Sequence, residues 1–154
     1  MECELHRMMK QNKLEALKTY FGYDAFRPAQ EQIIDQILSG RDVLAVMPTG
    51  AGKSLCYQLP ALLMPGITVV VSPLISLMMD QVKALNEAGV HAAYINSSLT
   101  ENQIGKALEL AAAGRYKIIY VAPERLETPR FLDFACHTEL SMITVDEAHC
   151  ISQW

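Results

Sequence analysis

The amino-acid sequence predicts an α/β fold in which helices cover both faces of a parallel sheet. Short apolar runs alternate with longer amphipathic stretches, which is the pattern of parallel strands joined by helical crossovers. A glycine-rich loop, residues 47–54, stands between one such run and a helix, as it does in phosphate-binding α/β domains. The 154 residues are enough for one domain with its own core.

The expected helices have recognisable first or last residues. Gly22 ends the first helix, and Pro28 opens the second. Thr100 and Gln103, three residues apart, form a capping box at the start of another. The expected helices are Leu5–Phe21, Pro28–Leu38, one from near Lys53, Leu74–Ala88, one from Thr100 to Gly114, and Pro129–Cys136.

The expected strands are short runs rich in β-branched and other apolar residues. Helical stretches separate them, so consecutive strands run parallel and the crossovers between them are right-handed. The expected strands are Val43–Met47, Thr68–Val71, His91–Ile95, Lys117–Val121 and Met142–Val145.

Composition excludes several classes of protein. The longest apolar stretch, Leu59 to Val71, is broken by prolines and a glycine and is too short to span a bilayer. The N-terminus has no basic start followed by an apolar run, so the expected location is the cytoplasm and no membrane partner is expected. A net charge of −4 argues against a histone-like basic binder. The four cysteines lack the spacing of a zinc site.

The glycine-rich loop has the composition of a phosphate-binding loop. Its residues are Met47, Pro48, Thr49, Gly50, Ala51, Gly52, Lys53 and Ser54. The glycines let the backbone curl so that N–H groups point at a phosphate, and the following helix N-terminus adds partial positive charge. Lys53 can reach the β- and γ-phosphates, and the Ser54 hydroxyl can bind Mg²⁺. The strict pattern begins with Gly where this chain has Met47, and the alternative is a glycine-rich turn that happens to precede a lysine.

A second candidate motif follows the last expected strand. Asp146 and Glu147 come directly after Met142–Val145, at the edge of a parallel sheet where ligands bind. Asp146 would hold Mg²⁺, and Glu147 would orient or deprotonate the attacking water. His149 beside them is interpreted as functional rather than as a satisfied structural histidine.

From Leu17 to Trp154 the chain resembles the RecQ family of superfamily 2 DNA helicases, and more closely its bacterial members. Residues 21–30, FGYDAFRPAQ, resemble the first motif of that family, and residues 47–54 resemble its phosphate loop, Met47 included. The resemblance implies that Gln30 hydrogen-bonds adenine while Tyr23 and Arg27 stack on the ring. Read without the family, these three residues would not stand out.

Two further segments resemble the DNA-contacting motifs of such motors. They are Ser72-Pro73-Leu74-Ile75-Ser76-Leu77 and Tyr120-Val121-Ala122-Pro123-Glu124-Arg125-Leu126. The resemblance implies DNA contacts from Ser72, Pro73, Glu124 and Arg125. The alternative for Glu124 and Arg125 is a local ion pair. Asn96 and Ser97 could contact the strand or cap the helix after it. Trp154 would begin the aromatic-rich loop that links DNA contact to ATP hydrolysis.

The resemblance implies an ATP- and Mg²⁺-dependent 3′-to-5′ helicase that acts on single-stranded or forked DNA in repair and recombination. Residues 1–154 would be its first RecA-like domain, incomplete at the C-terminus, with the adenine motif in helices within residues 1–40. A second RecA-like domain, whose arginine finger is worth about 10³- to 10⁵-fold in rate, would be missing. The chain alone is therefore expected to bind nucleotide and hydrolyse it poorly. The alternatives are a truncated nucleotide-binding module and, with little support, a small-molecule kinase.

Overall fold

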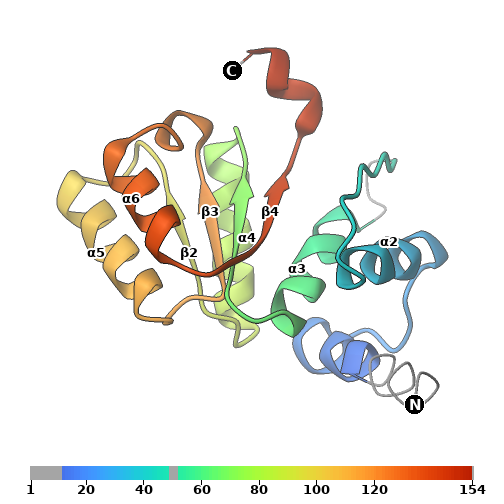
Figure 1. Cartoon of the computed structure of the whole chain (residues 1–154). Coiled ribbons are helices and arrows are strands. Elements are labelled where there is room, and N and C mark those ends of the chain that lie inside the picture. The colour runs from blue at the N-terminus through green and yellow to red at the C-terminus, as the bar shows by residue number, and fades with distance from the viewer. Residues whose placement is uncertain (1–11, 49–51, 154) are drawn as a thin grey trace. The chain divides into compact units, whose positions relative to one another are not determined.

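The computed structural model describes residues 12–48 and 52–153. The chain divides into two compact units, Met1–Met64 and Pro65–Trp154. The described part of the first unit contains helices, and the second contains the sheet (Figure 1).

The first unit is built around three helical segments. Residues 12–16 are α-helical and continue as the π-helix η1 (Leu17–Phe21), which ends at Gly22 as expected, with a left-handed φ of 75°. Helix α2 (Pro28–Leu38) and helix α3 (Lys53–Leu63) follow. Their apolar faces meet in a small core, since these side chains are almost completely buried: Ala16, Leu17, Ile34, Leu55 and Leu59.

The predicted strand Val43–Met47 is wrong. Residues 41–48 have no regular secondary structure, and the Leu44 and Val46 side chains are 87% and 92% exposed. A strand is stable only when its backbone groups pair with a neighbour. No described strand pairs with these residues, so an apolar run that is typical of a buried strand is irregular and exposed.

The second unit is organised on a four-stranded parallel sheet (Figure 1). Its strand order is β2-β3-β1-β4, so the first strand of this unit lies inside the sheet. All three neighbouring pairs are parallel. The strands are β1 (Ile67–Val71), β2 (Ala92–Ile95), β3 (Ile118–Val121) and β4 (Leu140–Val145).

Helices cover both faces of this sheet, which confirms the predicted fold class. Helices α5 (Glu101–Ala112) and α6 (Pro129–His137) bury Leu108 and Phe134 in the core on one face. Helix α4 (Ile75–Glu87) lies against the other face, where Met78 is fully buried (Figure 1). The short helices η2 (Pro123–Arg125) and η3 (Ala148–Gln153) follow β3 and β4 and were not predicted.

The helix boundaries agree with the local signals in the sequence. The Thr100 hydroxyl accepts from the Gln103 backbone N–H at 3.2 Å, and the Gln103 side chain accepts from the Thr100 N–H at 2.9 Å, so the predicted capping box is confirmed. Within the part of the chain that the structure describes, no helix is long and apolar enough to cross a membrane.

Strand β4 is only partly covered. In the described chain it pairs with β1 alone, with Val69 beside Ile143 and Val71 beside Val145. Val69 and Val71 are buried, whereas Ile143 is 65% exposed and Val145 is 39% exposed. The apolar face of the sheet therefore continues past the helices that cover it.

Candidate functional site

The described end of the phosphate loop is Gly52, immediately before α3. Its φ of 72° lies in the left-handed region that favours glycine. A Cβ at this position would lie 2.2 Å from Nε2 of Gln30, so no side chain fits there. Backbone that must approach this closely and turn this sharply is what a loop needs to curl around a phosphate. Thr49, Gly50 and Ala51 lie outside the described residues.

Lys53 and Ser54 stand at the start of α3. The Lys53 side chain is exposed and the Ser54 side chain is half-buried. The first turn of α3 contains no acidic residue, so no carboxylate there offsets the partial positive charge of the helix end. This arrangement suits a polyphosphate, and a hydroxyl in the first turn suits a divalent cation bound to it. The described residues therefore fit ATP with Mg²⁺.

Gln30 connects the adenine motif to the phosphate loop. Its side chain is almost completely buried. Oε1 accepts from the Arg27 backbone N–H at 3.0 Å, and Nε2 donates to the Gly52 carbonyl at 3.2 Å. Tyr23, 59% exposed, and the exposed Arg27 are accessible to a ring. The role of these three residues in adenine binding stays a prediction.

The acidic motif lies at the carboxyl end of β4. The Asp146 backbone N–H donates to the Val71 carbonyl at 2.9 Å, so β4 stays paired with β1 up to the motif. The Asp146 carboxylate accepts from the Glu147 N–H at 2.9 Å. The pairing of β4 with β1 thus fixes the position of the Asp146 backbone.

Glu147 has an unusual backbone. Its φ of 54° is left-handed, which L side chains rarely adopt. The turn that results lets the Cys150 N–H donate to the Glu147 carbonyl at 2.9 Å and begins η3. The Glu147 carboxylate, 25% exposed, lies 3.3 Å from Nε2 of His149, which is 75% exposed. Backbone strain of this kind is found mostly at functional sites, where a side chain must be held in one orientation.

The residues predicted to contact DNA differ in accessibility. Asn96 is fully buried, and its carboxamide accepts from the Ser98 N–H at 2.9 Å and donates to the Met78 sulfur at 3.4 Å. Asn96 therefore organises the turn after β2, whereas Ser97 is exposed. Ser72 is buried, and its Oγ has no partner among the described residues. Trp154 lies outside the described part of the chain.

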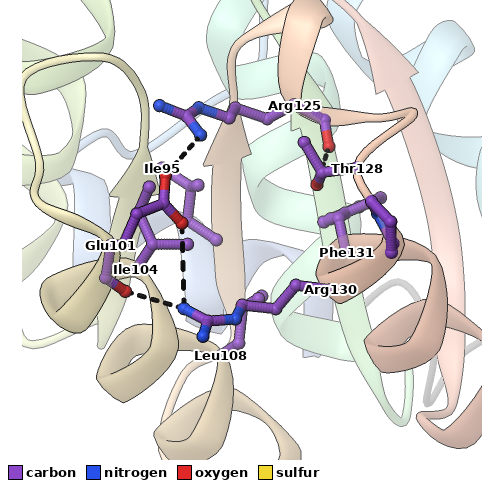
Figure 2. A pocket seen from close by; sticks show the side chains of 9 residues that line it. Ile95, Glu101, Ile104, Leu108, Arg125, Thr128, Arg130 and Phe131 are labelled. Carbon is purple, nitrogen blue, oxygen red and sulfur yellow. Dashed lines mark hydrogen bonds and ion pairs between the residues drawn. The ribbon is translucent and has the colours of Figure 1, made fainter.

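Arg125 is paired, but not with its sequence neighbour. Its Nη1 lies 3.2 Å from Oε1 of Glu101, at the start of α5 (Figure 2). The structure therefore does not support a local ion pair with the exposed Glu124. Arg130 also reaches Glu101, donating to its backbone carbonyl at 2.7 Å. Sequence reasoning missed Glu101 and Arg130, because neither belongs to a recognisable motif.

Two groups have shifted pKa values for physical reasons unrelated to the motifs. Burial raises the pKa of the Cys56 thiol in α3, and a backbone hydrogen bond partly opposes this. Burial lowers the pKa of Lys117, and the Glu139 carboxylate partly opposes this. The Lys117 ammonium donates to the Gly66 carbonyl at 3.1 Å, so Lys117 stabilises the fold by joining two distant segments.

Comparison with known proteins gives a family and several relatives. The profile of the family described as DEAD/DEAH box helicase matches residues 27–154. The chain is 48% identical over 146 residues to the ATP-dependent DNA helicase RecQ of Pasteurella multocida, a match that covers 95% of this chain and 23% of that protein. It is 49% identical over 139 residues to the Bacillus subtilis protein of the same name, covering 90% and 24%. The chain spans about a quarter of the length of these curated relatives.

A solved structure shares the fold. The DUF1998 helicase MrfA, whose crystal structure is bound to DNA, superposes with a TM-score of 0.67 at 16% identity, covering 87% of this chain and 26% of that one. At this identity the likeness concerns the fold alone. Together with the sequence matches, it confirms the resemblance to RecQ helicases and the RecA-like fold class.

Proposed function

Because this chain belongs to the DEAD/DEAH box helicase family, we propose that it is the ATP-binding part of a 3′-to-5′ DNA helicase that works in repair and recombination. Residues 1–154 would belong to its first RecA-like domain, and residues 1–40 would carry the adenine motif. The observation that supports this best is the hydrogen bond of Gln30 to Gly52, since it joins the adenine motif to the phosphate loop.

ATP would bind to the first unit. Residues 48–52 would surround the phosphates, and all of them except Pro48 have a backbone N–H that could donate. The exposed Lys53 ammonium would neutralise the β- and γ-phosphates. Tyr23 and Arg27 would flank the adenine ring by stacking, and Gln30 would hydrogen-bond the adenine edge. The contacts of Gln30 with Arg27 and Gly52 would hold the motif and the loop together. Ser54 and Asp146 are the proposed ligands of Mg²⁺, which would supply positive charge to the phosphates.

Hydrolysis would depend on Glu147. A carboxylate at the carboxyl end of β4 can orient a water molecule and accept its proton. His149 Nε2 lies 3.3 Å from the Glu147 carboxylate and would position that carboxylate. The left-handed φ of Glu147 supports the same assignment, because the fold keeps a costly backbone where the side chain must point in one direction.

A DNA strand would contact the second unit at the carboxyl edge of its sheet. Parallel strands all end at one edge, and ligands of such sheets bind there. Ser72 and Pro73 follow β1, Asn96 and Ser97 follow β2, and Glu124 and Arg125 lie just beyond β3. Of these, the exposed Ser97 and the partly exposed Arg125 are the best placed for phosphate contacts. Trp154 is proposed on the resemblance alone.

The second candidate function is a nucleotide-binding module without strand separation. The chain spans about a quarter of its relatives, and efficient hydrolysis in such motors uses an arginine finger that the second RecA-like domain would supply as a partner. For both candidate functions we propose a cytoplasmic location, because the cysteines of the described chain are free and thiols stay reduced there.

The test is binding of a fluorescent ATP analogue to this chain and to Lys53→Ala, followed by phosphate release with and without single-stranded DNA. Lys53 is exposed, so its removal leaves the fold intact. Binding that is lost in the variant supports the ATP site, and equal binding by both proteins refutes it. Release that DNA stimulates favours the helicase motor, whereas binding without release favours the module.

A further inference from the structure

One carboxylate joins two arginines on the surface of the second unit. Oε1 of Glu101 lies 3.2 Å from Nη1 of Arg125, and Oε2 lies 3.9 Å from Nη1 of Arg130. The same Arg130 nitrogen donates to the Glu101 backbone carbonyl at 2.7 Å. The arginines are 24 and 29 residues away in sequence, so the fold brings the three side chains together (Figure 2).

The three charged groups border a cavity of about 310 Å³. Ile95, Ile104 and Phe131 line its apolar part, and the two guanidinium groups reach the Glu101 carboxylate from different sides of it (Figure 2). A guanidinium beside an apolar wall is less hydrated than one on open surface, and its pairing with an anion is stronger.

Gly105 makes room for Arg130 on the surface of α5. A Cβ at Gly105 would lie 2.9 Å from Nη1 of Arg130, so any larger residue would push the guanidinium away. Arg125 is incompletely satisfied, because its Nε is buried and has no hydrogen-bond partner among the described residues. Glu101 therefore satisfies only part of the hydrogen-bonding capacity of Arg125 and Arg130.

We propose that Glu101 is an internal competitor of a DNA phosphate for Arg125 and Arg130. This inference rests on the proposed function, since it assumes that the second unit contacts a strand. Guanidinium groups bind carboxylates and phosphates with the same planar, two-pronged geometry. In the free chain the Glu101 carboxylate takes one Nη1 contact from each arginine, and a strand phosphate has to displace it to bind in the two-pronged geometry.

Displacement of Glu101 is feasible because its own side chain is 71% exposed, although that of Arg125 is only 22% exposed. Rotation of the Glu101 carboxylate into water restores its hydration, which offsets much of the ion pairing that it gives up. The carboxylate can therefore rotate into water while a phosphate takes both arginines. Glu101 would lower the affinity for DNA and neutralise one of the two arginine charges until a strand arrives.

The test is binding of fluorescein-labelled oligo(dT) to the 154-residue chain and to Glu101→Gln, with salt as a variable. We expect the variant to bind about 3- to 10-fold more tightly at low salt, because the arginines no longer have an internal carboxylate. Its plot of log affinity against log salt should be steeper by up to about 0.7, the counterion release expected when one more phosphate of a single strand is neutralised.

The matched control is Glu109→Gln. Glu109 lies on the same helix, is 74% exposed and pairs only with Lys106, at 4.0 Å, among the described ion pairs. Both variants change the net charge equally, so a general charge effect would appear in both. Replacing Arg125 and Arg130 with Met in the Glu101→Gln background should remove the gain.

The outcomes separate this inference from the proposed function. A gain in Glu101→Gln that Glu109→Gln lacks, and that requires the two arginines, supports the inference. Equal affinities in the two variants would overturn it while leaving DNA binding by the unit intact. Failure of every protein to bind oligo(dT), with folding verified by circular dichroism, would refute strand contact by this unit and the inference with it.

Discussion

The Gln30 side-chain amide donates a hydrogen bond to the Gly52 carbonyl at 3.2 Å, across 22 residues of sequence. One end of Gln30 thereby holds Gly52 of the phosphate loop, and the other accepts from the Arg27 N–H at 3.0 Å. A change in the adenine motif is therefore expected to alter the phosphate loop, and a change in the phosphate loop is expected to alter the adenine motif.

Gly52→Ala should disable nucleotide binding. Its φ of 72° strains any L side chain, and the new Cβ would meet the Gln30 amide at 2.2 Å. We expect a stability loss of about 1–3 kcal/mol and at least ~10-fold weaker binding of an ATP analogue. Gly40→Ala is the control, because Gly40 has a φ of 83° and open space around it. Equal binding by the two variants would contradict the importance of the Gln30 contact.

Gln30→Glu should separate the two hydrogen bonds of that side chain. The carboxylate can still accept from Arg27, but it cannot donate to Gly52, and two oxygens would face each other in a buried place. We expect unfolding free energy to fall by about 1–3 kcal/mol and ATP-analogue affinity to fall ~10-fold. Gln32→Glu, at an exposed position of the same helix, should change neither. Titration and urea unfolding of both variants measure this.

Glu147→Gly should be more stable than Glu147→Ala. Both lose the carboxylate and should lose hydrolysis, but only glycine relaxes at a φ of 54°. The expected difference in unfolding free energy is about 1 kcal/mol. Urea unfolding decides the point. If alanine proves as stable as glycine, the backbone at this position carries no strain.

Cys56 should make stability fall in alkaline solution. Burial raises the pKa of the thiol in the folded chain, so the unfolded chain ionises first. The contribution of the Cys56 thiol to the free energy of unfolding is complete below the pKa that the thiol has in the unfolded chain. It is lost as the pH rises through the higher pKa of the thiol in the folded chain. Urea unfolding under reducing conditions at about pH 7.5 and about pH 10 should show a drop that Cys56→Ala reduces. An unchanged drop in the variant would assign the alkaline loss to other groups.

Features that depend on neighbouring residues could be predicted from the sequence. The helix starts at Pro28 and Thr100 were correct, because a fixed φ and a capping box act within three residues. Strands β1 and β3 were placed to within one residue, because a run buried on both faces is apolar throughout.

Features that depend on distant residues could not be predicted from the sequence. Val43–Met47 has the composition of a buried strand, but strand formation requires a partner that the run itself does not specify. The contacts of Gln30 with Gly52 and of Arg125 with Glu101 join residues more than 20 positions apart. For Arg125 the sequence offered only its neighbour Glu124 as a partner, and the fold supplied another.

Among the described residues β4 pairs only with β1, and its partly uncovered face and its second edge have a consequence for handling the protein in solution. An exposed strand edge beside Ile143 and Val145 is a template on which a second polypeptide can add a strand. Self-association through it depends on concentration and is strengthened by salts such as sulfate. Light scattering of concentrated samples should therefore rise with ammonium sulfate, and Ile143→Lys, which places a charge on that strand, should delay the onset of turbidity.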